Sequence, residues 1–196
     1  MQQRFLEVKR YTLGGDYMQI KKVDVPLKIK DNLLRFVFRV YQGTNGAYPA
    51  LEWVENKPSP DDFERFKKVY ESFLEFRLKD EFDELYVLRD EDGKIAGTVA
   101  IVYNLKGKDV WWVPEDIKNE KTGLIEFFMV DPEYKGKGCG SKLLEFAVER
   151  LKELGKEVYV ITFPELEAYS YYLKKGFEKV MDYKEFVVLK MKDLFF

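Results

Sequence analysis

The chain has 196 residues, of which 46% are hydrophobic and 35% charged, and its formal net charge is −2. This length and apolar content fit a single folded domain over residues 1–196, and the near balance of charge disfavours a nucleic-acid binder. With no histidine and one cysteine, histidine-based nucleophilic catalysis, an internal disulfide and the common zinc sites are excluded, and we expect no metal.

The composition also bears on where the protein works. No segment approaches the roughly 18 apolar residues of a transmembrane helix, and the N-terminal MQQRFLEVKR lacks the pattern of a signal peptide. We therefore expect a cytoplasmic protein with no membrane partner. Lysine and glutamate dominate the charged residues while asparagine and glutamine are few, a bias associated with hyperthermophiles.

The first half of the chain predicts two hairpins and a buried helix between them. Four apolar segments beside turn residues are predicted strands: residues 4–12, 17–25, 85–89 and 95–103. Gly14-Gly15 and Asp92-Gly93 supply the two hairpin turns. Residues 32–41 are apolar nearly all round, which predicts a buried helix.

A second helix is predicted from a start signal at residues 59–62. Ser59 is the expected cap, Pro60 takes the first helical position, and acidic residues fill the first turn. Apolar residues then recur at helical spacing to an end near Lys79. Two long loops, residues 42–58 and 106–120, carry four aromatic side chains that either cover the core or shape a substrate pocket: Tyr48, Trp53, Trp111 and Trp112.

The second half predicts a strand, a glycine loop, a helix and another strand. The strands are residues 124–130 and 158–163, and the helix between them carries one apolar stripe and stops at Gly155. Such a βαβ unit places its two strands parallel and adjacent. Three elements close the chain: a helix at 166–175 and strands at 177–181 and 185–191.

The loop of this unit, VDPEYKGKGCGS, places glycine at positions 136, 138 and 140. Glycines at a helix start suit positive φ or close approach of a ligand, and the free N–H groups there attract an anion. A P-loop fits poorly, because Ser141 and Leu143 stand where its second glycine and magnesium-binding hydroxyl belong. The dinucleotide motif G-x-G-x-x-G also meets Ser141 at its last glycine. We therefore expect a phosphate cradle of another kind.

Two patterns here resemble the GNAT N-acetyltransferase superfamily. Its acetyl-coenzyme A motif, V-x-P-x-x-[RQ]-x-x-G-x-[GA], is matched by Val130, Pro132, Lys135, Gly138 and Gly140. Its downstream signature, A-x-x-x-Y-x-K-x-G-F, is matched by Ala168, Tyr172, Lys174, Gly176 and Phe177. Lys135 replaces the usual Arg or Gln, and Glu165 replaces an Asn often found there. The resemblance defines a motif-bearing core at residues 85–191 and leaves residues 1–84 as a variable N-terminal part.

The resemblance implies an α/β fold of the α+β kind. It is a mixed, mostly antiparallel central sheet with helices on both faces and a parallel, splayed strand pair at the cofactor site. The implied cofactor is acetyl-coenzyme A, whose pyrophosphate is held by loop amides and lysine charge and whose pantetheine arm pairs with a strand. The residues implied in cofactor binding are Phe128, Met129, Val130, Lys135, Gly136, Lys137, Gly138, Cys139, Gly140, Ser141 and Tyr172.

Catalysis is expected from two residues. By resemblance Tyr172 is the general acid for the leaving thiolate, although it shares a helical face with Tyr169 and could be a core residue. Glu126 is the candidate base, acting through water, because a lysine-like amine is mostly protonated at pH 7. Its alternative is a carboxylate that faces solvent or pairs with lysine. Cys139 is interpreted as a small buried hydrophobe rather than a nucleophile.

The predicted function is transfer of acetyl from acetyl-coenzyme A to a primary amine of a small molecule or peptide. The transfer is direct, in a ternary complex, and a homodimer is compatible with the sequence. An alternative is a non-catalytic GNAT-like module that binds coenzyme A or regulates a partner. A nucleotide-dependent phosphotransferase is a weaker third alternative, which magnesium-dependent ATP binding would support.

Overall fold

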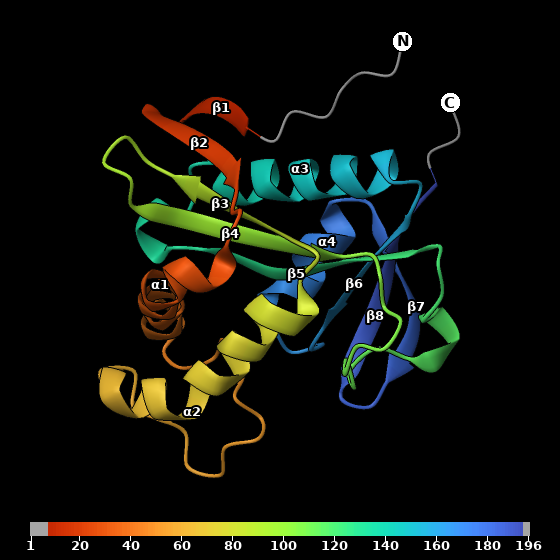
Figure 1. The fold of residues 1–196 in the computed structure, drawn as a ribbon, viewed down its shortest axis with the longest axis horizontal. Helices are drawn as coiled ribbons and strands as arrows, with labels where there is room; N and C mark the ends of the chain where they lie inside the picture. The colour runs from red at the N-terminus through yellow and green to blue at the C-terminus, as the bar shows by residue number, and fades with distance from the viewer. Residues whose placement is uncertain (1–7, 194–196) are drawn as a thin grey trace.

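The computed structural model describes residues 8–193. Within them eight strands form one sheet, in the order β1-β2-β3-β4-β5-β6-β8-β7 (Figure 1). The strands are β1 (Val8–Leu13), β2 (Asp16–Lys22), β3 (Glu84–Arg89), β4 (Ile95–Val102), β5 (Thr122–Val130), β6 (Glu157–Thr162), β7 (Phe177–Tyr183) and β8 (Phe186–Met191). Neighbours are antiparallel except β5 and β6. Residues 4–7 of the first predicted strand lie outside the described residues.

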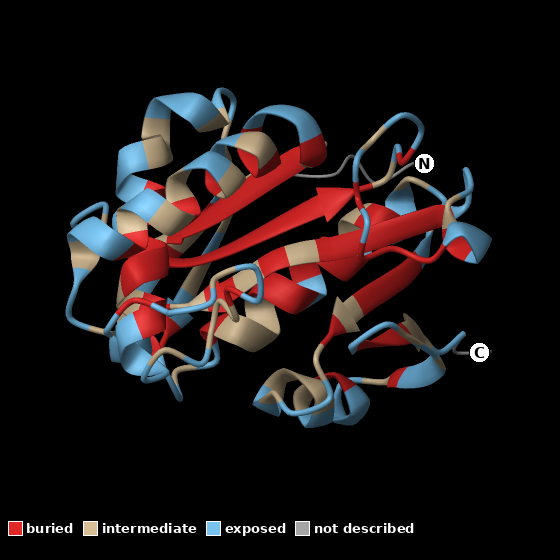
Figure 2. Cartoon of the chain, turned by 90° about the horizontal axis from the view of Figure 1, so that it is seen from below, coloured by how far each residue is buried: buried red, intermediate tan, exposed pale blue. Residues whose placement is uncertain are grey.

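Helices cover both faces of the sheet (Figure 1). They are α1 (Lys30–Gly43), α2 (Phe63–Phe76), α3 (Cys139–Glu153) and α4 (Glu167–Lys174). The buried side chains of α1 and α2 form one core with one face, and those of α3 and α4 form another with the opposite face. Figure 2 shows the consequence: most of the sheet is buried, whereas each helix carries both buried and exposed residues. No helix in the described part of the chain is long and apolar enough to cross a membrane.

The sequence placed the start of α2 three residues too early. The cap is Asp62, whose carboxylate accepts the N–H of Arg65 at 3.1 Å, and the helix begins at Phe63. Ser59 instead donates its hydroxyl to Asp61 in the preceding turn. Two residues of the start signal were thus used to order the turn, and the last acid of the run satisfies the helix N–H groups.

α2 continues into a π-helical turn at Arg77–Glu81 before the chain enters β3. The wider i→i+5 winding of a π-turn is rare and frequently marks a functional site. Here it turns Arg77 and Glu81 inward, where their side chains are 10% and 0% exposed.

The parallel pair β5 and β6 diverges after a short contact. Pairing joins Thr122–Leu124 of β5 to Glu157–Tyr159 of β6, and no pairing continues beyond Leu124 within the described residues. The rest of β5 pairs only with β4. The predicted parallel, adjacent and splayed arrangement is therefore confirmed.

Candidate active site

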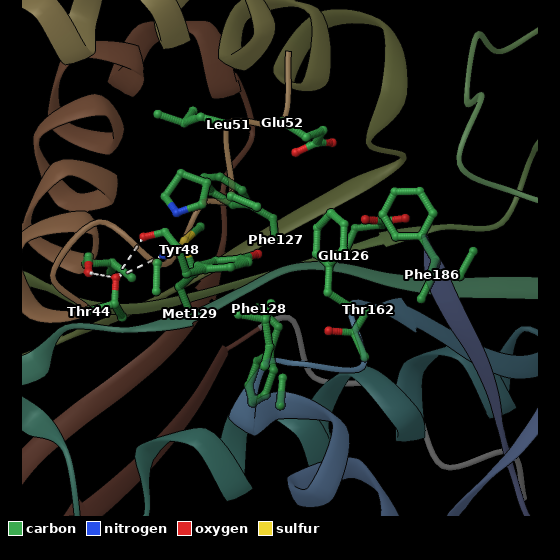
Figure 3. A pocket seen from close by; sticks show the side chains of 18 of the residues that line it. Thr44, Tyr48, Leu51, Glu52, Glu126, Phe127, Phe128, Met129, Thr162 and Phe186 are labelled. Atoms are coloured by element: carbon green, nitrogen blue, oxygen red, sulfur yellow. Dashed lines mark hydrogen bonds between the residues drawn. The ribbon is translucent and has the colours of Figure 1, made fainter. Parts of the chain in front are cut away.

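A cavity of about 520 Å³ opens where β5 and β6 part. Its walls come from the end of α1, the loop at 47–53, α2 with its π-turn, Trp111-Trp112, the two splayed strands and α4. Figure 3 shows Tyr48, Glu126 and Phe186 reaching into this space from three separate parts of the chain. A volume of this size is typical of a pocket for a small molecule or cofactor.

A bulge in β5 sets which side chains face the cavity. Thr98 of β4 pairs with Met129 but Ala100 pairs with Glu126, so β5 carries one extra residue between them. Phe127 sits in the bulge with φ +53°, and its carbonyl accepts the buried hydroxyl of Thr98 at 2.8 Å. The extra residue reverses the alternation of the strand. Glu126 and Phe127 consequently both lie on the α2 face, whereas Phe128 lies on the α3 face.

The glycine loop forms an open row of amides at the mouth of the splay. Gly136 and Gly138 have φ of +83° and +82°, and a Cβ added to either would meet nothing within 4 Å. α3 begins directly afterwards, at Cys139. The main-chain N–H groups of residues 136–141 find no carbonyl acceptor among the described residues. Consecutive free amides at a helix N-terminus suit an anion such as a phosphate.

The three loop lysines do not contribute equally. Lys135 is 81% exposed, and its ammonium lies 3.9 Å from the carboxylate of Glu167. Lys137 points to the β1–β2 turn, where its ammonium pairs with Asp16 at 2.5 Å. Lys142 pairs with an acid on the next turn of α3. Lys135, whose nearest acid is the most distant of the three, is therefore the loop lysine best placed to meet an anion.

A fourth lysine lies at the cradle although the sequence reading passed over it. Lys175 donates its ammonium to the Ser141 hydroxyl at 2.8 Å, next to the signature residue Lys174. Helix α4, which ends just before Lys175, also brings Tyr171 to the cradle. A Cβ on Gly140 would lie 3.5 Å from the Tyr171 hydroxyl and 3.6 Å from the Phe128 ring. α4 thus closes one side of the loop.

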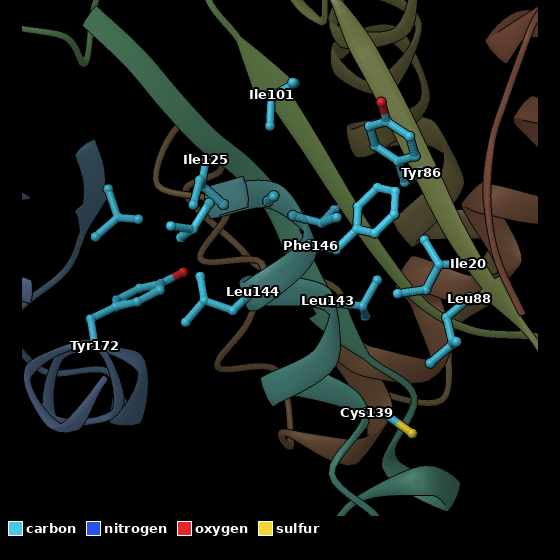
Figure 4. Close-up of a cluster of buried hydrophobic side chains, with 14 of the residues drawn as sticks. Ile20, Tyr86, Leu88, Ile101, Ile125, Cys139, Leu143, Leu144, Phe146 and Tyr172 are labelled. Atoms are coloured by element: carbon cyan, nitrogen blue, oxygen red, sulfur yellow. The ribbon is translucent and has the colours of Figure 1, made fainter. Parts of the chain in front are cut away.

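Tyr172 belongs to the core and to the cavity at once. Its side chain is 6% exposed, and its ring packs 5.5 Å from that of Phe177 and 6.0 Å from that of Phe128. Figure 4 shows it reaching from α4 toward Ile125 and Leu144. It lines the cavity, and burial, with smaller contributions from Tyr48 and Glu126, raises its pKa well above that of a free phenol. Tyr172 therefore keeps its proton at physiological pH.

Glu126 neither faces solvent nor pairs with a lysine. Its side chain is 12% exposed, and one carboxylate oxygen accepts the Arg77 guanidinium at 2.8 Å. The other oxygen accepts the indole N–H of Trp112 at 2.9 Å. Arg77 in turn pairs with Glu81, Nε to Oε1, at 2.8 Å. Two buried carboxylates share one buried guanidinium, so the group carries an excess negative charge when both are ionised.

This arrangement tunes the acidity of Glu126. Burial, together with the charge of Glu81, raises the pKa of Glu126 to about 7, while Arg77 and the Trp112 N–H oppose the rise. A carboxylate with this pKa is about half ionised at neutral pH and binds a proton readily. Perturbed carboxylates in a cavity are characteristic of catalytic sites.

The remaining candidates are placed as follows. Cys139 is 1% exposed, with its sulfur 3.7 Å from that of Met18, and burial raises the pKa of its thiol, which disfavours a nucleophilic role. Val130 faces the cavity, as Met129 does from the opposite side of β5. The four loop aromatics named from sequence all line the cavity.

The sequence reading missed Arg77 and Glu81, which complete the surroundings of Glu126. An i,i+4 pair of opposite charge at the end of a helix is an ordinary surface feature, so this pair carried little signal. Its inward direction depends on the π-turn and on a partner 49 residues away.

The chain belongs to the acetyltransferase (GNAT) family, whose model matches residues 47–177. This match confirms the family that the sequence predicted, and with it the prediction that the chain is an N-acetyltransferase, as far as family membership goes. The sheet confirms the predicted mixed, mostly antiparallel fold.

Three relatives give the range of similarity. A Pyrococcus horikoshii crystal structure, described as an acetyltransferase, is 61% identical, with a TM-score of 0.72 over 89% of this chain and 97% of its own. An uncharacterized N-acetyltransferase of Methanocaldococcus jannaschii is 28% identical over 88% of this chain, which spans only 62% of that relative. The PaiA N-acetyltransferase of Thermoplasma acidophilum, solved with coenzyme A, shares the fold at 14% identity, with a TM-score of 0.59 over 88% and 98% of the two chains.

Proposed function

We propose that the chain transfers the acetyl group of acetyl-coenzyme A to a primary amine, by direct attack in a ternary complex. One observation carries the proposal: a buried carboxylate with a pKa near 7 and an open amide cradle border the same region of splayed strands. A base and an anion site joined in this way are what an acyl transfer from a phosphate-bearing carrier requires.

The residues fit the proposed cofactor at its anionic end. The amides of residues 136–141 are free to bind a diphosphate, and the ammonium groups of Lys135 and Lys175 lie beside them. Each such contact contributes only about 0.3–1 kcal/mol, so several must act together. The unpaired stretch of β5 beyond Leu124 offers main-chain groups to the peptide-like arm.

Acetyl-coenzyme A, when bound, supplies a thioester: the amine nitrogen bonds to the acetyl carbon, the carbon–sulfur bond breaks, and the proton lost by the amine balances the proton gained by the thiol. Glu126 is proposed to accept that amine proton on a carboxylate oxygen, directly or through water. Arg77 and Trp112 hold the carboxylate in place from opposite oxygens. Tyr172 is proposed as the proton donor, because burial keeps its hydroxyl protonated.

The test separates an enzyme from a binding module. Calorimetry with coenzyme A measures the affinity, and a thiol-release assay with acetyl-coenzyme A and a panel of primary amines measures turnover. We expect micromolar-range binding and amine-dependent release. Binding without release on any amine contradicts the enzyme and supports the regulatory module, and absence of binding contradicts both.

Three further expectations are carried over from the sequence. The lysine- and glutamate-rich composition and the Pyrococcus and Methanocaldococcus relatives support a thermophilic origin. A cytoplasmic location and assembly as a homodimer are proposed on the sequence alone. Light scattering measures the assembly, and a melting temperature measures the thermal character.

A further inference from the structure

The cavity has a continuous aromatic wall on the α2 side. Its six rings come from five separate segments, and each ring packs against the next in this order: Trp53, Phe73, Trp112, Trp111, Phe186 and Phe163. Neighbouring centroids are 4.9, 6.3, 5.6, 5.9 and 4.7 Å apart in that order. All six line the cavity, so this aromatic wall is a surface offered to a ligand as well as a packed layer.

Two rings of the wall are open to solvent. Trp53 is 47% exposed and Trp111 40% exposed, which places them among the most exposed large apolar side chains of the described residues. Indoles left this open at a cavity are unusual unless something covers them, because apolar surface is stabilised by removal from water.

The protein's own cations already occupy cation-binding positions on this wall. The Arg77 guanidinium lies 5.3 Å from the Phe73 ring and 5.8 Å from the Trp112 ring. The Lys184 ammonium lies 5.3 Å from the Trp111 ring and donates to the Trp111 carbonyl at 3.1 Å. At Trp111 a second ammonium on a ligand would meet the like charge of Lys184, whereas an apolar body would not.

The wall also reaches the proposed base. The Trp112 indole N–H donates to Glu126 at 2.9 Å, so the carboxylate lies at the middle of the aromatic run. An amine delivered to Glu126 therefore comes close to the Trp112 ring. Burial of an apolar body there gains in proportion to the area removed from water, which exceeds the small gain of an exposed cation over a ring.

We propose that the acceptor is a monoamine with an aromatic or bulky apolar body on a short linker, lying on the aromatic wall with Trp53 and Trp111 as specificity-determining residues. This inference rests on the proposed acetyl transfer. It favours arylalkylamines over diamines, polyamines and small hydrophilic amines.

The release of coenzyme A thiol from acetyl-coenzyme A is measured with each of three amines as acceptor: 2-phenylethylamine, 1,4-diaminobutane and ethylamine. We expect kcat/KM for 2-phenylethylamine to exceed that for either competitor by ~10-fold or more. Trp53→Ala and Trp111→Ala should each reduce this ratio several-fold. Tyr17→Ala, which removes an equally exposed aromatic from β2, is the matched control and should leave the ratio unchanged.

A second variant tests the role of the resident cation. Lys184→Asn removes the ammonium over Trp111 and suits the left-handed backbone of that residue, where φ is +53°. It should raise kcat/KM for 1,4-diaminobutane relative to 2-phenylethylamine. An equal or greater preference for the diamine in the unaltered protein overturns the inference while leaving acetyl transfer intact.

Absence of turnover with every amine overturns the proposed function, and the wall is then tested by binding alone. Tryptophan fluorescence is titrated with 2-phenylethylamine in the presence of coenzyme A. A saturable change that is lost in Trp53→Ala and Trp111→Ala supports the wall as an arylalkylamine site. No change, or an equal change with 1,4-diaminobutane, overturns it.

Discussion

The two ends of the candidate site are built in opposite ways. The cradle end, residues 135–141, is one short run of main chain whose glycines leave amide groups free. The base end, formed by Arg77, Glu81, Trp112 and Glu126, gathers side chains from three distant segments around one buried guanidinium. A ligand's phosphate can be held by backbone geometry alone, whereas tuning a carboxylate needs charges brought together by the whole fold. Substitutions in the cradle should therefore change the affinity for coenzyme A, and substitutions around Glu126 should change the rate of acetyl transfer.

The largest effect is expected at Glu126. Glu126→Gln keeps the size but removes the proton acceptor and turns an amide NH₂ toward one of the two donors, Arg77 or Trp112, so kcat should fall by ~10²–10⁴-fold with coenzyme A affinity nearly unchanged. Steady-state kinetics and calorimetry measure the two quantities. Glu52→Gln, an exposed acid on the same cavity, is the control and should keep normal turnover. Equal losses in both variants would show a general electrostatic effect instead of a base.

Tyr172→Phe should lower kcat by about 10²-fold, because it deletes the proposed proton donor and retains the ring that packs on Phe177. Tyr169→Phe, on the same helix, is the matched control. Melting temperatures of both variants should stay close to the parent value. Unchanged turnover in Tyr172→Phe would assign this residue to the core alone.

The cradle end should respond in affinity. Gly136→Ala with Gly138→Ala forces two side chains into left-handed backbone, at about 1–2 kcal/mol each, and should weaken coenzyme A binding by ~10-fold or more. Gly93→Ala with Gly107→Ala is the matched double variant, since both glycines have φ near +80° and open space around them. It should lose similar stability and no affinity. Similar affinity losses in both would trace the effect to stability.

The smallest expected effect is a shift in pH dependence at the base end. Activity should rise with pH through about 7 as Glu126 loses its proton. The charge of Glu81 raises the pKa of Glu126, so Glu81→Gln should move the rise to lower pH by about 1 unit. Glu84→Gln breaks another buried ion pair, with Arg150, and should cost stability without moving the profile. An unchanged pH–activity profile in Glu81→Gln would show that Glu81 does not raise the pKa of Glu126.

The same contrast explains what the sequence could predict. The strand, glycine loop and helix of residues 124–154 carry their own signals, because the apolar stripe, the stop at Gly155 and the glycine spacing are all local. The bulge at Phe127 and the inward turn of Arg77 have no local signal. They depend on Thr98 and Glu126, which are far away along the chain. The predicted cap of α2 was wrong because Ser59, Asp61 and Asp62 could each cap a helix, and in the folded chain Asp62 does so.

The four loop aromatics illustrate an intermediate case. The sequence left two interpretations open, a cover for the core or a wall of a substrate pocket. In the structure all four line the same cavity, and Tyr48 and Trp112 also pack on the core. Sequence identified the residues but could not join Trp53 to Trp111, because the contact between them runs through Phe73 and Trp112. Long-range packing of this kind is set by tertiary structure and not by local pattern.

The most direct measurement of the central claim is an amide ¹H–¹⁵N NMR titration with coenzyme A. If the free N–H groups of residues 136–141 grip a diphosphate, their resonances should show the largest shifts and reach saturation together, while Gly93 and Gly107 stay unmoved. Saturable binding that leaves residues 136–141 unshifted would contradict the account, because the anion would then be held elsewhere on the molecule.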